Sequence, residues 1–191
     1  MSSFSSRPLF GGALSASLPA AYLDVSDVRQ VPDTQEVHVS RAADDVSCIV
    51  ELLQCVPGEG DECVKFHFDS LAHDNSASSS SILSIFALPS TTPFSPAPTR
   101  GGSLPAPLCL VGEQALVKYG RAHGTPECVR VWLAVYRLAP AANIDVVLSV
   151  NEPLGETALR GTQGMEASKA KEVFEEAARS LKIHDWAVFA E

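Results

Sequence analysis

The stretch VRVWLAVYRLAPAANIDVVLSV, residues 129–150, decides the fold of this chain. Its first part, 129–138, is rich in Val, Trp, Leu and Tyr, which is typical of a strand. Its last part, 144–150, places Ile, Val, Leu and Val at alternate positions, as in a second strand. The link from Pro140 to Asn143 is too short for a crossover, so the two strands are expected to form an antiparallel hairpin.

The pattern continues toward the N-terminus of this hairpin. Residues 108–119 predict another strand, with a turn expected at Gly112-Glu113. Residues 82–88 are also strand-like, and the nearly all-serine run 76–81 before them predicts a loop.

Residues 89–107 interrupt the strands and hold six of the thirteen prolines, together with Ser, Thr and Gly. This composition favours a surface insertion in extended or polyproline conformation. The strand pattern resumes beyond it, and 191 residues suit one ordinary core, so residues 1–191 are predicted to form one domain with this insertion.

The N-terminal part predicts two more hairpins. Gly11-Gly12 lies between apolar residues and suits a hairpin turn, because such turns need positive φ. Residues 36–39 alternate as a half-buried strand, and 47–56 form an apolar run that we interpret as its partner, with a helix as the alternative. Between them, Asp24 can cap a short helix that ends before Pro32.

Helical spacing appears twice. Val64, Phe68 and Leu71 form one apolar face over 61–74. A second helix is predicted over 165–182, and its buried stripe consists of Val173, Phe174, Ala177 and Leu181. Strands joined by hairpins and two amphipathic helices predict an α+β fold, a mostly antiparallel sheet sandwiched between helices.

The composition excludes some functions. A net charge of −9 argues against a general nucleic-acid binder and against docking on anionic lipid, and it suits a basic protein partner. No apolar stretch is long enough to span a bilayer, and no signal peptide is evident at the N-terminus. The five cysteines form no CxxC pair, so free thiols in a reducing compartment are expected and a metal site is not.

Catalytic motifs are absent from the sequence. It holds no nucleotide-binding glycine motif, no GxSxG and no HExxH. His67 and Asp69 are neighbours that point apart on a helix, so His67 is expected to be a surface or half-buried residue and not part of a catalytic dyad. His184 follows the last helix, where it is expected to meet the last carbonyl groups, and Asp185 is expected to cap the terminal turn. We therefore predict no catalytic residues and no cofactor.

The segment RQVPDTQEV, residues 29–37, is the best candidate site. Asp33 and Glu36 lie three residues apart across a predicted turn, so both carboxylates can face one patch that binds a basic surface. Chemistry alone favours the alternative in which Asp33 makes an Asx turn, Glu36 is solvated and Arg29 pairs with one of them.

These residues resemble those of the Ran guanine nucleotide release factor family, of the Mog type. The resemblance spans residue 9 to the end of the chain, and RQVPDTQEV is its most specific part. The other matching stretches are Leu9–Ala13, Leu23–Ser26, Ile49–Leu53, His67–Asp69, Tyr136–Leu138, Asp145, Asn151–Pro153, His184-Asp185 and Phe189.

The resemblance implies a function as well as a Mog/PsbP-like fold. The family binds the small GTPase Ran, promotes guanine nucleotide release and acts in protein transport through the nuclear pore, without catalysing bond cleavage. It implies that Asp33 and Glu36 contact Ran, with Arg29 and Gln35 as flanking candidates. It also implies a nuclear and cytoplasmic location, and other Ran-binding proteins are further candidate partners.

Two other functions stay open at this point. An adaptor would bind another protein, such as a membrane protein in trafficking, without acting on nucleotide. A photosystem subunit of the PsbP type would share the fold but would need a targeting region, which is not evident here.

Overall fold

The computed structural model describes residues 3–89, 104–116, 127–155 and 159–190. Most of the predicted insertion at 89–107 lies outside these described residues. The strands are β1 (Phe4–Leu9), β2 (Leu14–Pro19), β3 (Leu23–Asp24), β4 (Gln35–Val39), β5 (Ser47–Gln54), β6 (Ala77–Ala87), β7 (Leu108–Leu116), β8 (Glu127–Arg137), β9 (Ile144–Gly155) and β10 (Lys182–Ile183). The helices are α1 (Asp61–Asp74) and α2 (Lys169–Ser180), with short 3-10 turns η1 (Phe10–Gly12), η2 (Val25–Asp27), η3 (Met165–Ala167) and η4 (Trp186–Phe189).

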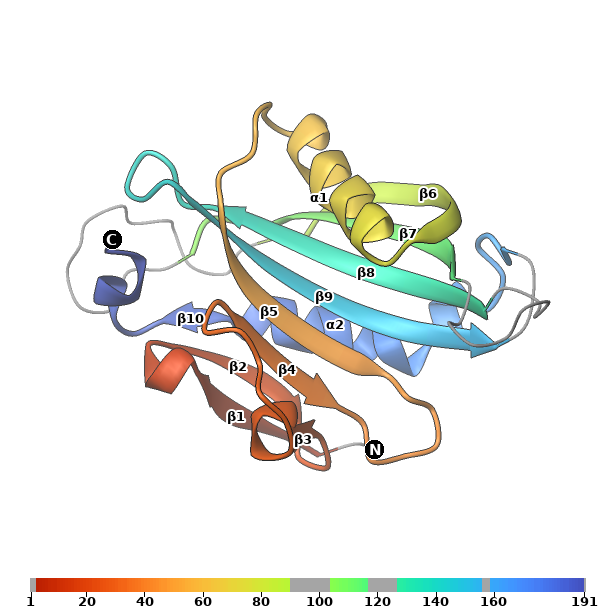
Figure 1. Cartoon of the computed structure of the whole chain (residues 1–191), viewed down its shortest axis with the longest axis horizontal. Coiled ribbons are helices and arrows are strands. Elements are labelled where there is room, and N and C mark those ends of the chain that lie inside the picture. Colours follow the sequence, from red (N-terminus) through yellow and green to blue (C-terminus); the bar gives the residue numbers. More distant parts are fainter. Residues whose placement is uncertain (1–2, 90–103, 117–126, 156–158, 191) are drawn as a thin grey trace.

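The described strands form a large antiparallel sheet and a small one. The large sheet has the order β3-β4-β5-β9-β8-β7-β6, and the small one has the order β1-β2-β10. Helix α1 lies over β6, β7 and β8 on one face of the large sheet, and α2 covers the opposite face (Figure 1). The predicted α+β class and the antiparallel hairpin of residues 129–150 are confirmed.

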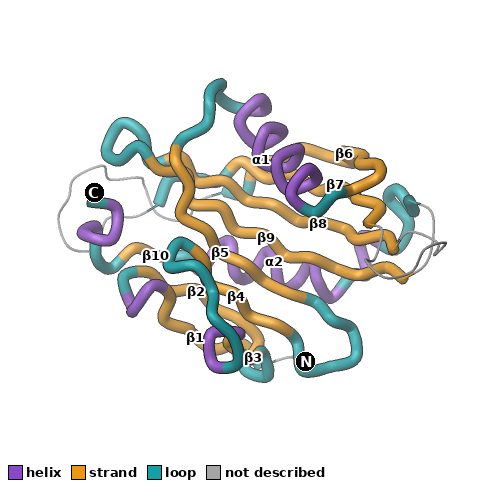
Figure 2. Tube along the Cα trace, in the orientation of Figure 1, coloured by secondary structure: helices purple, strands orange, loops and turns teal. Residues whose placement is uncertain are grey.

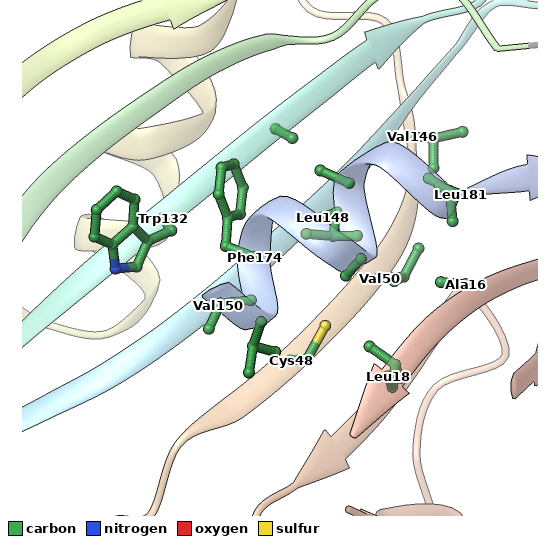
Figure 3. Close-up of a cluster of buried hydrophobic side chains, with 14 of the residues drawn as sticks. Ala16, Leu18, Cys48, Val50, Trp132, Val146, Leu148, Val150, Phe174 and Leu181 are labelled. Carbon is green, nitrogen blue, oxygen red and sulfur yellow. The ribbon is translucent and has the colours of Figure 1, made fainter. Parts of the chain in front are cut away.

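The central strands bury both of their faces. In β8, Trp132, Ala134 and Tyr136 enter the core on the α2 side, whereas Val131 and Leu133 pack toward α1. This alternation follows from the two-residue period of a strand. On the α2 side, Phe174 lies between Trp132 and Leu148, and β2 closes the same core with Leu18 (Figure 3). The large sheet therefore buries apolar side chains on both faces, and this burial holds α1 on one side and α2 on the other.

Two details of the predicted strands were wrong. The serine run does not form a loop, because Ser79, Ser80 and Ser81 pair with β7 in the edge strand β6. Small polar residues suit an edge strand, which needs no apolar face toward solvent. The predicted turn at Gly112-Glu113 does not form either, because β7 runs straight through these residues. The helix predicted over 165–182 begins later, at Lys169.

Gly112 gives the first testable prediction. A Cβ at this position would lie 2.5 Å from Phe68 Cζ and 2.8 Å from the Ser81 carbonyl oxygen. Gly112→Ala is therefore expected to lower the free energy of unfolding by about 1–3 kcal/mol through overpacking. Urea titration measures it. The loss should be smaller in a Phe68→Leu background, because the ring is then gone, and an equal loss in both backgrounds would contradict the proposed clash.

Candidate functional site

The acidic turn, residues Pro32–Glu36, forms as predicted and runs into the start of β4. The Gln35 N–H donates to the Pro32 carbonyl oxygen at 2.9 Å, and the Leu52 N–H donates to the Thr34 carbonyl oxygen at 2.9 Å. The second bond fixes the turn to β5. Asp33 is exposed at this turn, and its carboxylate has no hydrogen bond or ion pair with any residue that the structure describes. The Asx-turn alternative therefore does not form.

Glu36 has a different setting from Asp33. It is half-buried, and its Oε1 accepts a hydrogen bond from the backbone N–H of Phe10 in η1. Burial raises the pKa of its carboxyl, and the nearby carboxylate of Asp24 raises it further. One oxygen is thus held by the N-terminal hairpin, and the other remains available to a partner.

Gln35 and Glu36 lie on opposite faces of β4, as neighbours in a strand must. Gln35 Nε2 donates to Glu51 Oε1 at 2.5 Å, and both line a groove of about 290 Å³ between α1 and β5. The structure therefore separates Gln35 from Glu36. A partner would reach Gln35 only by covering the α1 side of the sheet.

Arg29 and its neighbour Val28 lie in the loop between η2 and β4, which runs beside β4 (Figure 2). Arg29 is exposed and makes no ion pair within the described ranges, so the predicted pairing with Asp33 or Glu36 does not form. Val28 is 67% exposed, more than any other large hydrophobic residue described. Val28 is not among the site residues predicted from the sequence, although an apolar residue between Asp27 and Arg29 is a visible signal.

Asp24 and His38 also lie close to Glu36. Asp24 caps η2, as predicted, because its Oδ1 accepts from the Ser26 N–H at 2.8 Å. Burial acts to raise the Asp24 pKa, but the Ser26 hydrogen bonds outweigh it and lower the pKa below its usual value. Asp24 lies opposite His38 in the β3–β4 pair.

A buried ionic network lies on the α1 side of the sheet. His67 Nε2 is 2.9 Å from Asp145 Oδ2, and Arg137 donates from Nε to Asp145 Oδ1 at 2.9 Å and from Nη2 to Oδ2 at 2.9 Å. Asp145 is fully buried, and burial alone would raise its pKa. The hydrogen bonds from Arg137 and His67 outweigh burial and hold the pKa well below its usual range.

Both histidines differ from their predictions. His67 is not a surface or half-buried residue, since it is 5% exposed and bound to Asp145. His184 does not meet helix carbonyls, because its Nε2 lies 2.7 Å from Ser15 Oγ. Asp185 caps the last turn as predicted, accepting from the Ala187 N–H at 2.9 Å.

Burial also shifts the pKa of a carboxyl and a thiol outside the acidic turn. The groove beside α1 contains Glu51, whose pKa is raised by burial although Gln35 hydrogen-bonds to it. All five cysteines are free, and burial raises the thiol pKa of Cys48 to about 12. Thiols held in their neutral form are poor nucleophiles.

Among the described residues, no helix is both long and apolar enough to cross a bilayer.

Comparisons with known proteins agree on one family. The family model described as Ran-interacting Mog1 protein matches residues 7–153. A Bos taurus protein named Ran guanine nucleotide release factor is 33% identical over 188 residues, covering 96% of this chain and 95% of that protein. The Homo sapiens protein of the same name is 33% identical over 187 residues, covering 95% of each. The crystal structure of the Saccharomyces cerevisiae Ran-binding protein Mog1p matches with a TM-score of 0.70 over 100% of both chains, at 23% identity, which supports the fold.

Proposed function

The chain belongs to the Ran-interacting Mog1 family, and we propose that it binds the small GTPase Ran and promotes release of its guanine nucleotide. The observation that carries this proposal is the match to relatives of that name over nearly the whole chain. The chain then acts in nucleocytoplasmic transport, and we propose both the nucleus and the cytoplasm as its location. Other Ran-binding proteins are further candidate partners.

We propose that Ran contacts the acidic turn and the loop before it. Among the described residues, Asp33 presents a carboxylate without a partner, and Glu36, three residues later, presents one oxygen without a partner. Arg29 and the exposed Val28 extend this surface. Two carboxylates next to an apolar side chain favour a partner whose basic side chains surround an apolar contact that excludes water.

The mechanism we propose is differential binding. A protein accelerates nucleotide loss only if it binds the nucleotide-poor state of the GTPase more tightly than the closed state. Asp33 and Glu36 would pair with basic side chains of Ran near its phosphate-binding elements. These side chains would then be drawn away from phosphate and magnesium, which lowers the barrier to nucleotide release.

Release of a fluorescent guanine nucleotide from Ran, with and without this protein, tests the proposal. Acceleration supports it. Binding without acceleration would favour an adaptor that contacts Ran but leaves its nucleotide in place. Neither binding nor acceleration would overturn the assignment of Ran as partner.

Val28 gives a second prediction. Val28→Ser is expected to weaken Ran binding about fivefold, since the contact would lose roughly 1 kcal/mol of apolar burial. Unfolding free energy should change by no more than about 0.5 kcal/mol, because the side chain is exposed. Ile82→Ser, at an exposed site on β6, is the matched control and should leave binding unchanged. Equal binding by both variants would place the contact away from Val28.

We further propose that the chain breaks no covalent bond. Its family acts by binding and release, which needs no nucleophile. In support, the buried His67 is bound to an Asp145 that Arg137 already neutralises, so this imidazole has no free carboxylate to make it a general base.

A further inference from the structure

Three side chains from two neighbouring strands converge on one face of the β3–β4 pair. Asp24 of β3 lies directly opposite His38 of β4, and Glu36 precedes His38 by two residues. All three therefore point to the same face, the side of the N-terminal hairpin. One potential ligand atom from each lies within 4.8 Å of the other two.

His38 is the unusual member of this cluster. It is only 2% exposed, yet neither Nδ1 nor Nε2 has a hydrogen-bond partner among the described residues. Buried polar atoms in folded proteins nearly always have a hydrogen-bond partner, so we expect these nitrogens to contact a bound group. Burial lowers the pKa of the imidazole, with Asp24 opposing and Arg7 adding to the shift. A neutral imidazole nitrogen is the commonest metal ligand in proteins.

The two carboxylates are oriented by their own neighbours. Asp24 Oδ1 accepts from the Ser26 N–H at 2.8 Å and from Ser26 Oγ at 2.7 Å, and Glu36 Oε1 accepts from the Phe10 N–H. The second oxygen of each has no partner within the ranges described. Carboxylates that bind metals are typically held in this way: a hydrogen-bond donor of the protein fixes one oxygen, and the other oxygen is left for the metal.

No Lys or Arg in the part of the chain that the structure describes forms a salt bridge with either carboxylate, although Arg7 is close enough to act on Asp24 electrostatically. The nearby Arg7 donates instead to the carbonyl oxygens of Ala20 and Tyr22, at 2.8 and 3.4 Å. This is the difference from the cluster of Cys63, His67 and Asp145, which also has ligand spacing. There the guanidinium of Arg137 already occupies the centre, bonded to Asp145 and to Cys63 Sγ at 3.2 Å.

We propose that Asp24, Glu36 and His38 form a binding site for a divalent transition-metal ion, Zn²⁺. One imidazole nitrogen and two carboxylate oxygens suit zinc, whereas Mg²⁺ and Ca²⁺ prefer oxygen ligands alone. Zinc–ligand bonds of about 2.0–2.2 Å place two ligand atoms roughly 3.3 Å apart. The ligand atoms of the three side chains lie within 4.8 Å of one another, so small side-chain rotations bring them to that separation. Asp24 and Glu36 are only half-buried, which leaves water free to complete the coordination. This proposal departs from the sequence-based expectation of no metal site.

Calorimetric titration of Zn²⁺ into the full-length chain tests this site. We expect one equivalent to bind, and His38→Gln to weaken binding at least about 100-fold, more than loss of an orienting group usually costs. Cys63→Ser, in the competing cluster, and His73→Gln, at an exposed histidine, should bind zinc as the wild type does. The titration is run without Ran, so its result is read separately from nucleotide release, although the zinc ion would use the Glu36 oxygen that we also propose to face Ran.

If His38→Gln fails to fold, the absorption spectrum of Co²⁺ bound to the wild type tests the site in place of that variant. Cobalt bound to the wild type should show d–d absorption without a thiolate-to-metal charge-transfer band. A thiolate band, a loss of zinc binding only in Cys63→Ser, full affinity in a folded His38→Gln, or no binding by the wild type would each overturn the proposal.

Discussion

The Asp33→Lys/Glu36→Lys variant is expected to lose all stimulation of nucleotide release from Ran and to bind Ran at least about 30-fold more weakly. Two new positive charges would repel the basic groups that we propose on Ran, and they would leave these groups unpaired in the contact. Release of a fluorescent nucleotide and equilibrium binding to Ran measure the two effects separately.

The same variant should unfold more easily, but only through Glu36. Asp33 has no partner in the described structure, so its replacement should change the free energy of unfolding by no more than about 0.5 kcal/mol. Glu36→Lys removes a charge-assisted bond to the Phe10 N–H and should cost about 1.5–3 kcal/mol. Single variants therefore distinguish a lost contact from a weakened hairpin.

Asp69→Lys/Glu176→Lys is the matched control. Both residues are exposed on helices, and the change in net charge is the same. This control should stimulate release normally. If it failed as the acidic-turn variant does, overall charge rather than the acidic turn would govern the interaction. Normal stimulation by the acidic-turn variant would place the Ran contact elsewhere.

The Asp145→Ala variant should show the largest loss of stability, about 3–5 kcal/mol of unfolding free energy. The substitution leaves the guanidinium of Arg137 and the buried His67 without the carboxylate that both contact. It also removes the acceptor for the Val56 N–H, which donates to Asp145 Oδ2 at 3.2 Å. Urea or thermal unfolding measures the loss.

The pH dependence of unfolding provides an independent check on Asp145. Its pKa is lower in the folded protein than in the unfolded chain, so the unfolded state binds more protons as the pH falls. The stabilisation is complete above the ordinary aspartate pKa near 4 and is lost progressively below it. The wild type should therefore lose stability more steeply below pH 4 than Asp145→Ala does. Parallel pH profiles, or a cost no larger than that of the exposed Asp69→Ala, would show that this network contributes little.

The sequence alone determined the elements whose apolar residues repeat at a regular period. The two-residue period gave the β8–β9 hairpin, and the helical period gave α1 with its predicted bounds. The turn before β4 also followed from local chemistry, because Pro32 and Asp33 specify it within four residues. Pairing across a sheet carries no such local signal, so the strand character of the serine run in β6 was missed.

The settings of the charged side chains were decided only by the tertiary structure. Glu36 meets Phe10 from 26 residues away, and His67 meets Asp145 from 78 residues away. Asp24 reaches His38 through strand pairing. A side chain's period along its own strand predicts which face it occupies, but not what the other layer brings to that face. The burial of a charged side chain, its pKa and the ligand atoms near it depend on that second layer. They are therefore fixed only when the β1–β2 hairpin and α1 pack against the sheet.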